Sequence, residues 1–145
     1  MIAKSTAAAA LVPFLLVGTV AAQSGDGLQA NKALADRYHM EVIQGKNLDL
    51  IDEIFVANPV IHYGSPDVTG RDKARQIAQV DHTYFPGGTD FRHDQVVAEG
   101  NLVAFRWTMT GIQESGEESL YTGIDIVRIE NGRIAEMWIE LNPVE

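Results

Sequence analysis

The stretch YTGIDIVRIENGRIAEMW, Tyr121 to Trp138, decides the fold, because it has the pattern of two strands joined by a tight turn. Asn131-Gly132 is the strongest short hairpin signal in the chain, since a two-residue type I′ turn needs positive φ at both central positions. One strand nevertheless carries a carboxylate, Asp125, between two isoleucines. An unpaired buried charge is costly unless it is hydrogen-bonded, paired or protonated. Asp125 is therefore the first residue that needs an explanation.

The turn predicts what faces Asp125. If Glu130 pairs with Arg133, the strand register places Asp125 opposite Trp138. An indole wall removes water from one side of the carboxyl group and favours its neutral form, which suits a proton donor or a base tuned towards neutrality. The alternative is a structural aspartate that bonds a backbone amide or a nearby arginine.

The first 22 residues have the layout of a secretory signal peptide. Lys4 supplies the positive start, the apolar run 7–20 is short and rich in alanine, and small residues precede Gln23. This pattern predicts cleavage after Ala22 and a secreted or periplasmic protein. An uncleaved membrane anchor is the alternative interpretation.

Composition narrows the class of protein. The 145 residues include no cysteine, which excludes disulfides, thiol nucleophiles and thiolate metal sites. The net charge of −9 opposes binding to nucleic acid or to anionic membranes. The length that remains after cleavage suits one domain, 28–145, behind a flexible leader, 23–27.

Helical patterns fill the first half of this domain. Apolar residues recur at four-residue spacing through Leu34, Tyr38 and Val42, which predicts a helix over 28–44 that ends at Gly45. Asn47 can cap a second short helix. A short strand is expected over 59–63 and a third helix over 71–84.

The second half of the domain has the pattern of an antiparallel sheet, with turns at 100–101, 115–116 and 131–132. The expected strands cover 91–98, 102–113, 119–130 and 133–141. Helices followed by a sheet indicate an α+β domain in which a curved antiparallel sheet wraps the N-terminal helices.

Three segments together resemble the SnoaL-like polyketide cyclases of the nuclear transport factor 2 superfamily. They are YHMEVIQGKNLDLIDEIF, VVAEGNLVAFRWTMTG and GIDIVRIENGRIAEMW, and the resemblance covers nearly all of 28–141. It implies a cone-shaped sheet, a cystatin-like α+β barrel, that encloses an apolar pocket. The aspartate that matches Asp125 acts in this family as the acid/base of an intramolecular aldol cyclisation, without a cofactor.

The same family resemblance bears on assembly. Families of this kind usually pair through the outer face of the sheet. The predicted register places Ile124, Ile126, Met137 and Ile139 in one apolar patch on the face opposite Asp125. That patch predicts a homodimer.

A more distant resemblance is to the ketosteroid isomerases. Tyr38 and Asp125 match the tyrosine and the neutral aspartic acid that donate to the enolate oxygen in that family. The family's catalytic carboxylate falls near Tyr63, beside His62, and neither residue is an acid. His62 could serve as the base instead, or it could be a structural histidine.

The other candidates have weaker signals. Trp107 and Phe105 share an alternating apolar face with Met109, which forms either the pocket lining or plain core. His39, His82 and His93 are expected to be solvated or packed, and their spacing does not match a metal site. The predicted catalytic residues are thus Asp125, His62 and Tyr38, and the predicted ligand-binding residues are Tyr63, Phe105, Trp107 and Trp138.

The leading hypothesis is a secreted domain that performs cofactor-independent acid/base chemistry on a small apolar carbonyl compound. The reaction would be an aldol cyclisation, an isomerisation or a dehydration. A non-catalytic carrier of small apolar molecules fits the sequence equally well. A dehydratase that pairs His62 with Asp125 is a third hypothesis.

Overall fold

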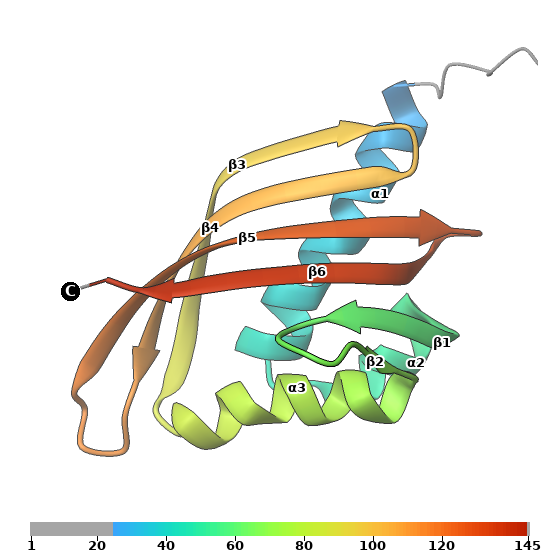
Figure 1. Cartoon of the computed structure of the whole chain (residues 1–145). Coiled ribbons are helices and arrows are strands. Elements are labelled where there is room, and N and C mark those ends of the chain that lie inside the picture. The colour runs from blue at the N-terminus through green and yellow to red at the C-terminus, as the bar shows by residue number, and fades with distance from the viewer. Residues whose placement is uncertain (1–24, 145) are drawn as a thin grey trace, which may run out of the picture.

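The computed structural model describes residues 25–144, and the predicted signal peptide therefore lies outside the described residues. The elements follow the order helix, strand, helix and then four long strands (Figure 1). They are α1 (Gly25–Arg37), η1 (Tyr38–Gln44), η2 (Leu48–Leu50), α2 (Ile51–Ile54), β1 (Phe55–His62), β2 (Val68–Thr69), α3 (Arg71–Tyr84), β3 (Gly88–Glu99), β4 (Leu102–Ile112), β5 (Glu118–Glu130) and β6 (Arg133–Pro143).

The first helical region ends before Gly45, as predicted, but it differs from the prediction in its start and in the type of helix in its second half. Residues 25–27 of the expected leader are helical, because α1 begins at Gly25. From Tyr38 onward the helix widens into the π-helix η1, which ends in a hydrogen bond from the Gly45 N–H to the Met40 carbonyl. The second helix forms where expected, but the Asn47 side chain makes no capping hydrogen bond.

The six strands form one curved sheet in the order β2-β1-β6-β5-β4-β3 (Figure 1). All neighbouring pairs are antiparallel except β1 with β6, which are parallel. The short strand β1 thus joins the C-terminal hairpin. The structure confirms the α+β class and the curved sheet with its N-terminal helices.

The Asn131-Gly132 turn forms as predicted, with φ of 50° and 71°, and Glu130 pairs with Arg133. Between Arg128 and Ile129, however, the β5–β6 ladder shifts by one residue. This bulge places Asp125 opposite Ile139 instead of Trp138, so the register predicted for that pair is wrong.

The same shift changes the predicted apolar patch. Ile124 and Ile126 face outward and are exposed, whereas Met137 is buried and Ile139 lies on the inner face. The outer face therefore keeps only half of the residues that were assigned to the patch. The homodimer stays a prediction.

The inner face of the sheet carries the core. On β4 the buried residues alternate, and they are Val103, Phe105, Trp107 and Met109. On β5 the buried positions include Gly123, Asp125 and Val127. In Figure 1 α1 lies behind the sheet and α3 lies below it, so the helices close the inner face.

Candidate active site

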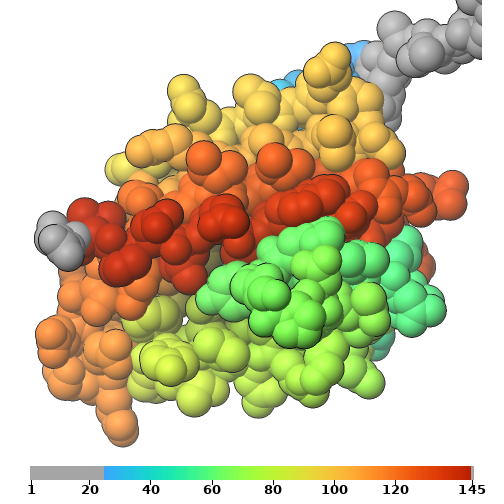
Figure 2. Space-filling view, in the orientation of Figure 1, coloured from blue at the N-terminus to red at the C-terminus, as the bar shows by residue number. Residues whose placement is uncertain are grey.

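A hollow opens between the inner face of the sheet and the helices. It encloses about 460 Å³ when the open space at its mouth is included. In Figure 2 the surface is hollowed where β6, the end of β1 and α3 meet. Its lining comes from η1, α3, β3, β4, β5, β6 and the first residue after β1. It consists of Tyr38, His39, Ile43, Tyr63, Ile77, Val80, Asp81, Phe91, Trp107, Met109, Asp125, Ile139 and Leu141.

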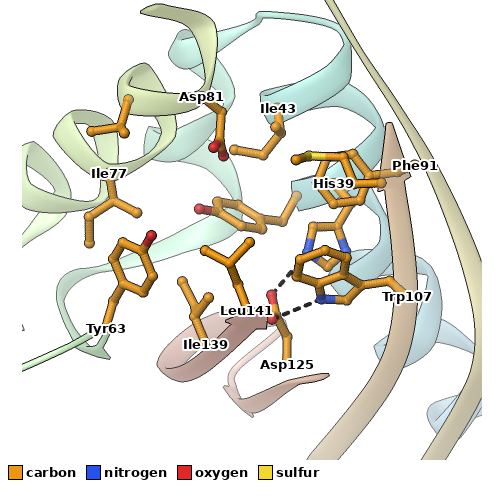
Figure 3. A pocket seen from close by; sticks show the side chains of 13 residues that line it. His39, Ile43, Tyr63, Ile77, Asp81, Phe91, Trp107, Asp125, Ile139 and Leu141 are labelled. Carbon is orange, nitrogen blue, oxygen red and sulfur yellow. Dashed lines mark hydrogen bonds and ion pairs between the residues drawn. The ribbon is translucent and has the colours of Figure 1, made fainter. Parts of the chain in front are cut away.

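Asp125 lies on the inner wall of this hollow and is 1% exposed. The Trp107 Nε1–H donates to Asp125 Oδ1 at 3.0 Å, and His39 Nε2 lies 2.9 Å from Asp125 Oδ2 (Figure 3). Both carboxyl oxygens therefore have a partner, which explains how the aspartate is tolerated between two isoleucines. The predicted indole contact exists, but it comes from Trp107 on β4.

His39 is the residue that the sequence interpretation missed. It was expected to be solvated or packed, yet it is 3% exposed and bonded to Asp125. A signal was present, because Ala35, His39 and Ile43 recur at four-residue spacing beside the stripe that contains Tyr38. All three are buried, so the buried side of this helix is two rows wide.

Aromatic rings enclose the His39 imidazole. Phe91 stacks on it with ring centroids 4.7 Å apart. The ring centroids of Phe105 and Trp107 lie 5.7 and 5.9 Å from that of His39. Phe105, which was predicted to bind the ligand, is 1% exposed and belongs to the core, not to the lining of the hollow. The histidine–aspartate pair is therefore held in a dry environment, in which electrostatic interactions are strong.

Two tyrosines line the hollow as predicted. Burial raises the pKa of Tyr38 well above its ordinary value, and the charges of Asp81 and Asp125 raise it further. Burial and the same two carboxylates also raise the pKa of Tyr63. Both side chains therefore remain phenols at neutral pH and can donate hydrogen bonds into the hollow.

A second carboxyl group, Asp81, points into the hollow from α3 (Figure 3). Burial raises its pKa from 3.8 to about 6, with an opposing contribution from His39 and a further increase from Asp125. The sequence interpretation did not single it out. Its signal is the spacing from Ala74 and Ile77 on the inner side of α3.

His62 and Trp138 do not reach the hollow. Tyr63, the first residue after β1, lines the hollow, whereas His62, the last residue of β1, contacts Glu136 and Trp138 outside it. His62 Nε2 lies 2.9 Å from Glu136 Oε1, and its ring stacks on Trp138 at 4.9 Å. Pairing of His62 with Asp125 in a dehydratase is therefore not supported by the structure.

Within 25–144, no group of three or more histidine or acidic side chains is arranged to hold a metal ion. None of the helices in the same range is long and apolar enough to cross a membrane.

Comparison with solved structures shows the same fold in several proteins. A proposed SnoaL-like polyketide cyclase from Jannaschia sp. CCS1 is 19% identical, with a TM-score of 0.70 over 83% of this chain and 91% of its own. IdmH, a proposed polyketide cyclase from Streptomyces antibioticus, is 23% identical, with a TM-score of 0.66 over 79% of this chain and 92% of its own.

A third similar structure, an LEH-like epoxide hydrolase from M. tuberculosis, is 13% identical, with a TM-score of 0.66 over 79% of this chain and 84% of its own. No curated protein matches the chain in sequence. The sequence model of the SnoaL-like domain matches residues 35–137, which include the helix with His39 and the strand with Asp125. The chain belongs to the family of SnoaL-like domains.

Proposed function

We propose that this protein catalyses proton transfer at the carbon next to the carbonyl group of a small apolar compound, leading to an intramolecular aldol cyclisation or an isomerisation. The observation that carries this proposal is the His39–Asp125 pair, in which His39 Nε2 lies 2.9 Å from Asp125 Oδ2. Both residues line a mostly apolar hollow. A titratable pair in a dry pocket is the arrangement that general acid/base catalysis needs. The family membership points to the same class of reaction.

In the proposed reaction Asp125 acts as the base. Its carboxylate removes a proton from the α-carbon, the C–H electron pair forms a C=C bond, and the carbonyl electron pair moves to oxygen. The enolate carbon then attacks a second carbonyl group of the same molecule, or it is reprotonated elsewhere. In either case the proton returns from the protein to the product, so the reaction needs no external reductant or oxidant.

The phenols and the second carboxyl group have separate roles. Tyr38 donates a hydrogen bond to the enolate oxygen, because its high pKa keeps it protonated. Asp81 faces Asp125 across the hollow, and its pKa of about 6 suits a group that returns a proton. Two carboxyl groups in different environments can thus divide the acid and base steps between them.

Hydrogen–deuterium exchange tests the proposal without knowledge of the natural substrate. The purified protein is incubated in D2O with 2-tetralone, an apolar bicyclic ketone, and proton NMR follows loss of the α-hydrogens. Exchange faster than in buffer is expected. In Asp125→Asn the excess rate should fall on the order of 10²- to 10⁴-fold, because the amide cannot accept the proton.

Asp26→Asn is the matched control, since Asp26 is exposed on α1. It should leave the exchange rate unchanged. A ketone that binds in the hollow but keeps its hydrogens would contradict the proposal and favour the non-catalytic carrier. The carrier remains the second candidate, because most of the lining is apolar.

A further inference from the structure

The buried pair does not end at His39. His39 Nδ1 lies 2.9 Å from His93 Nε2, and His93 Nδ1 lies 2.9 Å from Asp36 Oδ1. We propose that Asp125, His39, His93 and Asp36 form a proton relay that connects the hollow to solvent at Asp36 on α1. The catalytic purpose of the relay rests on the proposed function, whereas its existence does not.

Exposure increases along this row. The side chains of Asp125 and His39 are 2% and 3% exposed, that of His93 is 10% exposed and that of Asp36 is 47% exposed. The four residues come from β5, η1, β3 and α1, so the row leads from the inner face of the sheet to the exposed carboxylate on α1. Asp36 is its solvent end.

The Asp36 carboxylate determines which atom donates in each hydrogen bond of the row. A half-exposed aspartate is a carboxylate at neutral pH and can only accept, so His93 carries its proton on Nδ1. Burial and the charge of His39 lower the pKa of His93, which keeps this ring neutral. Its Nε2 is then an acceptor, and His39 must donate from Nδ1.

One proton remains for the contact between His39 and Asp125. Trp107 can only donate, so its hydrogen bond places no proton on the carboxyl group. The 2.9 Å contact between His39 Nε2 and Asp125 Oδ2 therefore holds one proton, which belongs either to an imidazolium or to a carboxylic acid. Three hydrogen bonds thus contain three protons, all oriented by Asp36.

If each proton moves across its own hydrogen bond, Asp125 loses a proton at the hollow and Asp36 gains one at the solvent end. The Asp125 O–H bond breaks and a His39 Nε2–H bond forms. The His39 Nδ1 proton passes to His93 Nε2, and the His93 Nδ1 proton passes to Asp36. Movement of the three protons in the opposite direction protonates Asp125 again. Phe91 and Phe105 pack against His39, so the row replaces a water path at this point.

The relay predicts that a substitution at Asp36 changes which ring nitrogen of His39 carries a proton. Independent contacts would not couple the two residues in this way. Lysine can only donate, so Asp36→Lys should move the His93 proton from Nδ1 to Nε2. His93 then donates to His39 Nδ1, and His39 donates from Nε2 to Asp125. Both rings should therefore change tautomer together.

Long-range proton–nitrogen correlation spectra of histidine-labelled protein, recorded without any ligand at neutral pH, measure this directly. In wild type, Nδ1 of both rings should carry a proton, whether the proton shared with Asp125 sits on His39 Nε2 or on the carboxyl group. In Asp36→Lys, Nδ1 of both rings should be unprotonated and Nε2 protonated. His82 is an internal reference, because its Nε2 lies 3.0 Å from the Val42 and Ile43 carbonyls and must donate.

Two variants complete the experiment. Asp36→Glu keeps the acceptor and should retain the wild-type tautomers. Asp26→Lys makes the same change of charge on the same helix and should also leave them unchanged. A His39 tautomer that does not respond to Asp36→Lys would overturn the relay, whatever the ketone exchange assay shows. Failure of that assay alone would instead remove the proposed reaction.

Discussion

The two faces of the sheet each carry a histidine–carboxylate pair at 2.9 Å, and they differ in their surroundings. On the inner face, the side chains of His39 and Asp125 are 3% and 2% exposed. On the outer face, those of His62 and Glu136 are 25% and 21% exposed, and Arg128 also binds Glu136. Water screens the outer pair, whereas the inner pair interacts in a low-dielectric environment. The same residue types can thus contribute a surface contact or a reactive site, depending on the strand face.

Removal of the carboxylate from each pair should produce the largest difference. Asp125→Ala leaves the Trp107 N–H and His39 Nε2 without a partner inside the protein. This should lower the free energy of unfolding by about 3 to 5 kcal/mol. Glu136→Ala, the matched change on the outer face, should cost at most about 1 kcal/mol.

Urea denaturation of both variants at neutral pH measures this difference. Equal losses of stability in the two variants would show that burial does not separate the pairs.

The stability at acidic pH tests Asp81, the second carboxyl group that lines the hollow. The pKa of Asp81 is about 6 in the folded protein, raised by burial, and 3.8 without the fold. Between these values Asp81 binds more protons in the folded protein than in the unfolded chain, so its own contribution to stability falls as the pH rises from about 4 to 6. Asp81→Asn removes the cost of the buried charge and should be more stable than wild type at neutral pH by about 2 to 3 kcal/mol.

The two proteins should have similar stability near pH 4, where Asp81 is largely protonated in the folded protein. Asp49→Asn, at an exposed position, serves as the control. Denaturation curves across this pH range give the comparison. If wild type and Asp81→Asn differ by the same amount at every pH, the raised pKa of Asp81 is refuted.

The support of the inner pair can be changed without touching either member. A Cβ at Gly123 would lie 2.1 Å from the Trp107 ring and 2.4 Å from the Glu140 carbonyl oxygen. Gly123→Ala should therefore displace the indole from Asp125 and cost about 1 to 3 kcal/mol. Ile124→Ala, one residue further on the exposed outer face, should cost less.

The NMR resonance of the Trp107 indole N–H reports the displacement. It should shift in Gly123→Ala and stay in place in Ile124→Ala. An unshifted resonance in Gly123→Ala would mean that the indole is not held against the strand by close packing.

Local patterns in the sequence predicted the helices, strands and turn that carry this site, but not the contacts between the residues that form it. The third helix was expected over 71–84 and forms there, and the Asn131-Gly132 turn has the expected φ angles. Alternation along the expected strand correctly grouped Phe105, Trp107 and Met109 on one face, which is buried. These features depend on neighbours in the sequence, and their signals are correspondingly direct.

The missed features depend on contacts between distant segments. The bulge between Arg128 and Ile129 moved Trp138 away from Asp125, and the hairpin turn alone does not reveal such an extra residue. His39 meets Asp125 across 86 residues of sequence, and His93 lies 54 residues from His39. Helical periodicity could have indicated that His39 and Asp81 point inward, but their partners are set by how the helices dock on the sheet.

The outer pair provides the smallest expected effect and completes the comparison. The hydrogen bond to Glu136 raises the pKa of His62 above its ordinary value of 6.5, against a lowering by burial, and Asp67 raises it further. A histidine whose pKa is higher in the folded protein than in the unfolded chain stabilises the fold fully at pH values below its pKa in the unfolded chain. That contribution is lost as the pH rises through its pKa in the folded protein.

Wild type should therefore lose up to about 1 kcal/mol between about pH 6 and pH 8, the value typical of a partly exposed ion pair. Glu136→Gln removes the main cause of the raised His62 pKa, so the loss of stability over the same range should be smaller, with the contribution of Asp67 still in place. Added salt should also reduce the wild-type loss, because the pair is open to water. Urea denaturation at both pH values, with and without salt, measures these changes. A loss that is larger than about 1 kcal/mol and insensitive to salt would show that His62 is as dry as His39, and the distinction between the two faces would then fail.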